Sequence, residues 1–265
     1  NGLTRGMKRG RKPTDKDFTY VRPFKVLSKE SYADKYKLSP PLIVKTLLPS
    51  VALSEYDKAS QLTLSRDQLT VSGSDGGYRM VRATHGLHWG SYYWELEVLQ
   101  GSPDSHIRVG WSTRQGELQG PVGFDQYSYA YRDVGGSKVH RSIRVDGYGE
   151  PFSTGDIIGC FIHLSDESSV HLNRMSFFKN GIEQGDAYVG SEIPCGVYFP
   201  AVSLYLKANV RVNFGPSFIL RPTSLAANVN AVSELQPMSY EDRKIHEQNI
   251  LAIRSQRLES LNRIA

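Results

Sequence analysis

The central part of the chain consists of short runs in which apolar and polar residues alternate. The runs at residues 93–98 and 107–111 place apolar residues at every second position, which is typical of a strand with one buried face. Residues 157–164 are almost wholly apolar, and an apolar run this short predicts a central strand. Farther along, Asn180-Gly181 stands between apolar residues, which indicates a hairpin turn.

Gly-rich turns, and no helical patterns, separate these strands, so residues 61–218 are predicted to form an antiparallel β-sandwich in an all-β protein. Residues 41–60 mix Pro with apolar residues and predict an irregular lead-in. A linker at 219–239 precedes residues 240–265, which lack Gly and Pro and predict a helix. This helix either packs back on the sandwich or seeks a partner groove. Its amphipathic stripe consists of Ile250, Ile253, Leu258, Leu261 and Ile264.

The net charge of +5 on the 265 residues is the average of two unlike parts. Residues 1–40 hold 11 Lys and Arg against 4 Asp and Glu, which leaves 21 basic and 23 acidic residues in the rest of the chain. This basic arm is expected to be disordered or extended in isolation. The arm has three possible functions: it contacts DNA by neutralising phosphates, it is a nuclear localisation signal, or it is only a solvated tail. Its densest run resembles an AT-hook and contains Lys8, Arg9, Arg11 and Lys12.

Sequence signatures of enzymes are absent. The chain has no Gly-x-Ser-x-Gly elbow, phosphate-binding loop or dinucleotide fingerprint. Cys160 lies within an apolar run and reads as an inert buried thiol, and His85 and His88 lack the further ligands of a metal site. No run approaches the ~18 to 20 apolar residues of a membrane span. We therefore expect a soluble intracellular protein with no catalytic residues, no metal, no cofactor and no small-molecule substrate.

The most distinctive stretch, residues 119–132, gathers aromatic residues next to an arginine. Rigid aromatics and Arg are enriched at binding surfaces, where Arg can hold a carboxylate through two hydrogen bonds. By alternation Tyr127, Tyr129 and Tyr131 share one face and are predicted to be mostly core, whereas Arg132 faces outward. Arg108 also points away from the apolar face of its run. The residues predicted to bind an acidic peptide with apolar anchors, against the alternative of a merely solvated face, are Pro121, Phe124, Arg108 and Arg132.

Ordered motifs over residues 60–218 resemble the SPRY domain. Three of them are general to SPRY domains: Gly110-Trp111-Ser112, Gly155-Asp156-Ile157-Ile158-Gly159 and Lys179-Asn180-Gly181. Narrower blocks resemble the Ash/Bre subunit of the COMPASS/MLL histone methyltransferases, with a fungal Bre-like member as the nearest type. They are His85-Gly86, Phe124-Asp125-Gln126-Tyr127-Ser128-Tyr129 and Asn213-Phe214-Gly215-Pro216.

The resemblance implies a non-catalytic nuclear scaffold. In that family the sandwich binds an acidic segment of the WD-repeat subunit (retinoblastoma-binding-protein-five/Swd type), and the pair stimulates the SET-domain methyltransferase. The C-terminal helix docks on the dumpy-thirty/Sdc homodimer, and a basic linker similar to residues 8–12 contacts nucleosomal DNA. The family's peptide-binding positions correspond here to Tyr78, Arg108, Pro121, Phe124 and Arg132.

Two departures from the family pattern bear on the predicted site. Phe124 stands where animal members have Tyr, which removes a hydroxyl, and Val134 replaces a Lys. The site therefore lacks one acid-pairing charge unless Lys138 supplies it. The alternative function is a SPRY peptide-recognition module of the ubiquitin-ligase adaptor type. The basic arm and the C-terminal helix disfavour this alternative.

Overall fold

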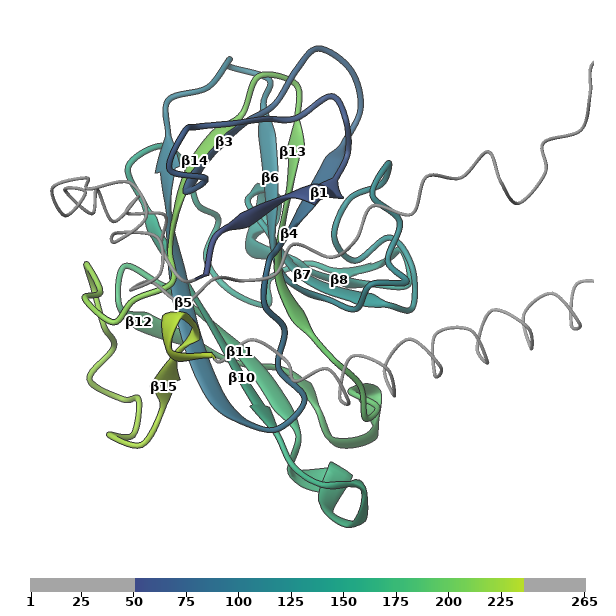
Figure 1. The fold of residues 1–265 in the computed structure, drawn as a ribbon, viewed down its shortest axis with the longest axis vertical. Helices are drawn as coiled ribbons and strands as arrows, with labels where there is room; N and C mark the ends of the chain where they lie inside the picture. The colour runs from purple at the N-terminus through teal and green to yellow at the C-terminus, as the bar shows by residue number, and fades with distance from the viewer. Residues whose placement is uncertain (1–50, 236–265) are drawn as a thin grey trace, which may run out of the picture. The chain divides into compact units, whose positions relative to one another are not determined.

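A computed structural model describes residues 51–235 (Figure 1). Two antiparallel sheets make up this part of the chain. The first sheet, here called sheet A, has seven strands in the order β1 (Leu53–Lys58), β4 (Arg79–Ala83), β13 (Phe199–Tyr205), β6 (His106–Ser112), β7 (Ser128–Arg132), β8 (Lys138–His140) and β9 (Ile143–Val145). The predicted arm at 1–40 and the predicted helix at 240–265 lie outside the described residues.

The second sheet, sheet B, has eight strands, of which seven follow one path. Their order is β12 (Ile182–Val189), β11 (Arg174–Lys179), β10 (Ile157–Leu164), β5 (Gly90–Leu99), β14 (Asn209–Asn213), β3 (Thr70–Ser72) and β2 (Thr63–Leu64). The eighth, β15 (Asn230–Ala231), pairs in parallel with β5. Short 3₁₀ helices complete the described secondary structure: η1 (Val134–Gly136), η2 (Glu167–Leu172), η3 (Gly190–Glu192) and η4 (Val232–Glu234).

The predicted antiparallel β-sandwich is confirmed, and its alternating runs are strands. Residues 93–98 belong to β5 and 107–111 to β6, while 157–164 form β10, which lies between β11 and β5. Asn180 and Gly181 both have positive φ angles, 51° and 79°, as the hairpin turn between β11 and β12 requires.

The core lies where the apolar faces of the strands meet. Trp94 of β5 and Trp111 of β6 are both fully buried, and their rings meet edge to face with centroids 6.2 Å apart. This geometry lets the positive edge of one ring contact the negative face of the other. Tyr129 and Tyr131, predicted to be core, are 1% and 0% exposed, while Tyr127 is half-buried. The alternating pattern therefore placed Tyr129 and Tyr131 in the core correctly, although the other face of β7 is also buried at Ser128 and Ala130.

The sandwich is longer at both ends than the predicted range 61–218. β1 begins at Leu53 within the predicted lead-in, but its pairing with β4 changes register between Leu53 and Lys58, which erases the period-two pattern. At the other end, the predicted linker is held by the fully buried Glu95, whose carboxylate accepts hydrogen bonds from the backbone N–H groups of Ile219 and Leu220. Val232, farther along, is completely buried. Such long-range contacts leave no local pattern.

The face of sheet A that points away from sheet B is covered at its centre by the segment between β6 and β7. Val122 of this segment packs on a small apolar cluster that consists of Met80, Ala130, Val139 and Ala201. The segment is thus fixed over the outer face of the sheet. It carries Pro121 and Phe124, two of the predicted binding residues.

Candidate functional site

We call residues 113–127, which join β6 to β7, the site loop. Its first turn is fastened to the sheet by Arg82 of β4, a guanidinium that is only 2% exposed. Arg82 donates to the backbone carbonyls of Thr113 and Gly116 at 3.1 and 3.0 Å, and to that of Arg114 at 3.4 Å. It also donates to Ser112 Oγ at 3.2 Å. One buried side chain therefore sets the conformation of the turn.

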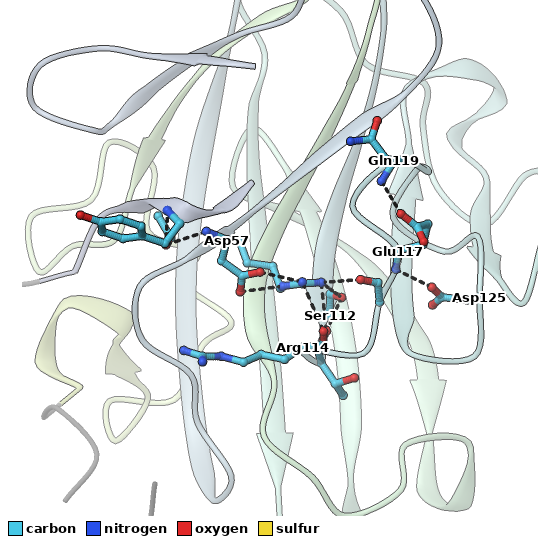
Figure 2. Close-up of polar contacts among 11 residues, drawn as sticks. Asp57, Ser112, Arg114, Glu117, Gln119 and Asp125 are labelled. Atoms are coloured by element: carbon cyan, nitrogen blue, oxygen red, sulfur yellow. Dashed lines mark hydrogen bonds and ion pairs between the residues drawn. The ribbon is translucent and has the colours of Figure 1, made fainter. Parts of the chain in front are cut away.

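Asp57 of β1 balances the charge of Arg82. Its two carboxylate oxygens accept from Arg82 Nε at 3.0 Å and from Nη2 at 2.7 Å. Figure 2 shows Asp57, Ser112 and Arg114 at one end of the site loop, and Glu117, Gln119 and Asp125 along it. A bidentate pair of this kind fixes direction as well as distance. β1 therefore supports the loop although it lies far from it in the sequence.

Asp125 closes the far part of the site loop. One carboxylate oxygen accepts from the backbone N–H of Glu117 at 2.8 Å, and the other accepts from Tyr127 N at 2.9 Å and from Ser128 Oγ at 3.1 Å. The Phe124 side chain, held between these contacts, is 50% exposed. Because the loop is ordered before any ligand arrives, binding to it costs less conformational entropy.

Tyr78, Arg108 and Arg132 meet at one end of the outer face of sheet A, and we call them the arginine cluster. The Arg108 guanidinium lies over the Tyr78 ring, 4.9 Å from its centroid. Arg108 and Arg132 are direct cross-strand partners on β6 and β7, so their side chains share a face. Arg108 Nη1 also donates to the carbonyl of Val122 at 3.4 Å, which brings the site loop beside the cluster.

Polar atoms of the arginine cluster are buried without hydrogen-bond partners. Among the described residues, no partner is found for Tyr78 Oη, Arg108 Nε or Arg132 Nε. Burial raises the pKa of Tyr78 and lowers the pKa of Arg108, since each shift reflects a charged form removed from water. Two adjacent, partly desolvated guanidinium groups with spare donors are suited to an anionic ligand that supplies carboxylate oxygens.

The structure brings together all five residues predicted to bind a peptide. Tyr78, Arg108 and Arg132 form the cluster, and the half-buried Pro121 and exposed Phe124 stand on the adjoining loop. Lys138 does not supply the missing charge. It pairs with Tyr131 on the opposite face of the sheet, where its Nζ donates to the Ala187 carbonyl at 2.6 Å. The expectation that Lys138 replaces the missing charge was therefore wrong, because its position along β8 directs its side chain to the inner face of sheet A.

Sequence reasoning missed the residues that support or border the cluster. Asp57 and Arg82 gave no signal, because a buried ion pair between distant strands leaves no local pattern. Tyr205, whose ring lies 5.1 Å from that of Tyr78, is brought there by the pairing of β13 with β4. His106 and Asp133, which bond to each other at 3.0 Å, likewise meet only through strand register.

Three further findings concern metal binding, thiol chemistry and membrane-spanning helices in residues 51–235. Within that range, no group of three or more His, Cys, Asp or Glu side chains is arranged to hold a metal ion. Cys160 is fully buried, and this burial raises the pKa of its thiol well above the ordinary value, which keeps the thiol protonated. A search of the same range for membrane-spanning helices found no helix with the necessary length and apolar character.

Comparison with known proteins gives the site a context. Residues 91–217 match the SPRY domain family. The chain is 34% identical over 234 residues to "Set1/Ash2 histone methyltransferase complex subunit ASH2" of Drosophila melanogaster, an alignment that covers 74% of this chain and 41% of the relative. It is 30% identical over 227 residues to "Set1 complex component ash2" of Schizosaccharomyces pombe, with 60% and 35% covered.

The chain is also similar to proteins with other names. "Ran-binding protein 9" of Xenopus tropicalis is 32% identical over 177 residues, which cover 64% of this chain and 31% of that protein. The crystal structure of the SPRY domain of human HERC1 superposes with a TM-score of 0.51 at 17% identity and covers 63% of this chain and all of that domain. This second likeness concerns the fold alone. The chain spans about two fifths of the length of the fly relative.

Proposed function

We propose that this chain, which matches the SPRY domain family over residues 91–217 and is similar to the Ash2 subunits of Set1/Ash2 histone methyltransferase complexes, acts as a non-catalytic, regulatory subunit of such a complex in the nucleus. In this role the sandwich binds an acidic segment of the complex's WD-repeat subunit. The bound pair then supports the SET-domain enzyme that methylates histone lysine.

The observation that carries this proposal is the arginine cluster. Arg108 and Arg132 lie side by side on neighbouring strands, and each has a buried Nε without a partner among the described residues. Leaving a buried charged donor unpaired costs more than leaving a neutral donor unpaired. A carboxylate from a partner would satisfy these donors, so the cluster favours an acidic ligand over a neutral one.

The site loop explains why the ligand is expected to be a peptide with an apolar side chain. Phe124 is a large aromatic residue left half-exposed, and its ring rests beside Gly120, where an added Cβ would stand 3.2 Å from the ring. Rigid aromatic side chains of this kind serve as anchors in interfaces. An extended segment could therefore place carboxylates on the two arginines and an apolar residue against Phe124 and Pro121.

The two ends of the chain extend the proposal to further partners. The stripe that includes Ile250 and Leu258 would enter the groove of a dumpy-thirty/Sdc-type homodimer. The run that includes Lys8 and Arg11 would contact the phosphates of nucleosomal DNA. Both segments lie outside the described residues, so their support is the sequence pattern and the kinship with Ash2 subunits.

Calorimetry with a synthetic peptide rich in Asp and Glu around one Val tests the peptide site. Arg108→Ala should weaken binding by about 2 kcal/mol or more, as hot-spot arginines do. The matched control is Arg211→Ala, since Arg211 lies on sheet B, where it pairs with Asp67 at 2.9 Å. If Arg108→Ala binds the peptide as tightly as the unchanged protein, the site assignment is wrong.

A further inference from the structure

A histidine–aspartate pair, His106 and Asp133, borders the arginine cluster on the outer face of sheet A. His106 Nδ1 lies 3.0 Å from Asp133 Oδ2, and the two side chains are 34% and 11% exposed. The other oxygen of Asp133 accepts from the backbone N–H of Val134 at 2.8 Å. The carboxylate is therefore held on two sides, and its place next to His106 is fixed by the end of β7.

A chain of ring contacts through Tyr205 and Tyr78 joins His106 to Arg108. His106 is the cross-strand partner of Tyr205, and their rings stack with centroids 5.9 Å apart. Tyr205 contacts Tyr78 at 5.1 Å, and Tyr78 lies under the Arg108 guanidinium. Since residues 106 and 108 follow each other at a spacing of two on β6, both side chains face the same surface.

We propose that His106 is a third cationic contact of the peptide site, and that Asp133 orients it and sets the charge that an acidic ligand meets. This inference rests on the proposed function. With His106 neutral, Arg108, Arg132 and Asp133 sum to +1. When His106 is protonated the sum is +2. Because its Nδ1 faces Asp133, the Nε2–H of the protonated ring is left to donate to a ligand.

The other side chains around this pair are tyrosines and arginines, types whose ordinary pKa values lie well above neutral pH. Tyr205 of β13 stacks on His106, and Tyr78, just before β4, contacts Tyr205; burial raises the pKa of Tyr78 further above its ordinary value. Arginine side chains keep their charge throughout the pH range in which histidine changes charge. Carboxylates of the ligand are ionised throughout the range in which histidine changes charge. A change of affinity across that range therefore reports on His106.

The test measures binding of the synthetic acidic peptide by calorimetry between about pH 6 and about pH 8, where a histidine changes its charge. The unchanged protein should bind about fivefold more tightly at the lower pH, the effect of one extra charge at the far side of the cluster. His106→Gln should bind equally at both pH values, at the level of the neutral ring. His88→Gln, a change of an exposed histidine outside the site, should keep the pH dependence.

Asp133→Asn separates this role from a structural one. Asn can still accept from Val134 N, and loss of the negative charge should tighten binding of the acidic peptide at about pH 8 by roughly threefold or more. A purely structural role predicts weaker binding instead. If His106→Gln keeps the pH dependence, or Asp133→Asn weakens binding, this inference is wrong.

Arg108→Ala keeps the two proposals apart. If Arg108→Ala loses peptide binding while His106→Gln keeps the pH dependence of the unchanged protein, only the role of His106 is overturned. Unchanged binding in Arg108→Ala would instead overturn the peptide site itself. A peptide with Gln and Asn in place of the acidic residues should show no dependence on pH in any variant, because it carries no charge for the cluster to attract.

Discussion

The carboxylate of Asp57 and the guanidinium of Arg82 form two parallel hydrogen bonds, 3.0 and 2.7 Å long, between β1 and the strand beside it. Arg82 is 2% exposed, and it also donates hydrogen bonds to Ser112 and to the first turn of the site loop. A single ionic contact thus ties β1, which lies outside the segment matched to the SPRY family, to the loop that carries Phe124.

Asp57→Ala should lower the free energy of unfolding by about 3 kcal/mol, because it leaves a buried guanidinium without its counter-charge. Urea denaturation measures this. Asp75→Ala is the control, since the Asp75–Lys207 pair is 82% and 63% exposed, and exposed pairs contribute at most about 1 kcal/mol. Replacing Arg82 by Met in the Asp57→Ala background should recover part of the loss; equal losses in Asp57→Ala and Asp75→Ala would contradict this account.

Tyr78→Phe should leave the stability of the folded protein unchanged or slightly higher, because the buried Tyr78 Oη has no partner among the described residues. Peptide binding should nevertheless weaken by about 1 kcal/mol if the ligand supplies the missing acceptor. Unfolding and calorimetry on the same samples separate the two effects. Tyr56→Phe, at a fully exposed residue, should alter neither; loss of stability in Tyr78→Phe would show that the hydroxyl already has a role in the fold.

Glu95→Gln should change how stability depends on pH. Burial raises the pKa of Glu95 above its ordinary value, so the folded state holds this proton more tightly than the unfolded state. Its contribution to stability is fully present below the unfolded pKa of about 4.3 and is lost as the pH rises through the higher folded value.

The stability advantage of the unchanged protein over Glu95→Gln should therefore shrink as the pH rises from about 5 to about 8. Urea denaturation at several pH values gives this difference. Glu183→Gln, at an exposed residue of β12, should show a constant difference. If the stability advantage of the unchanged protein over Glu95→Gln instead grows with pH, the hydrogen bonds from residues 219 and 220 outweigh burial and lower the pKa of Glu95.

Leu258→Glu should abolish co-elution of the chain with a dumpy-thirty/Sdc-type homodimer in size-exclusion chromatography, because a charge in the centre of the stripe would have to be buried in the groove. Ser255→Glu adds the same charge off the stripe and should preserve co-elution. Retained co-elution of Leu258→Glu would indicate that the stripe packs within this chain.

Replacement of Lys8, Arg9, Arg11 and Lys12 by Ala should flatten the salt dependence of nucleosome binding. Each lost phosphate contact removes about 0.9 from the slope of log affinity against log salt. Electrophoretic mobility shifts over a salt series measure the slope, and the paired change Lys35→Ala and Lys37→Ala serves as the control within the same arm. A slope that does not change would remove DNA from the proposed function.

Local pattern predicted those parts of the fold where one face of a strand is buried. β5 and β6 were found because residues 94 and 111 and their alternate neighbours are buried in the core, and β10 because it is a short apolar run buried on both faces. Parity also placed Arg108 and Arg132 on the outer face of sheet A. The register shift in β1 and the capture of residues 219 and 220 by Glu95 were not predictable, since neither leaves a periodic signal.

The sequence by itself determined which residues face outward, where the charge lies along the chain, and which motifs the sandwich shares with its relatives. Those properties depend on residue type and on spacing within single strands. Only the tertiary structure decided that Arg108 is paired with Arg132, that Asp57 supports the site loop through Arg82, and that His106 meets Asp133 beside the cluster. Each of these contacts joins distant segments through strand pairing or a buried ion pair, and neither is encoded in any local stretch of residues.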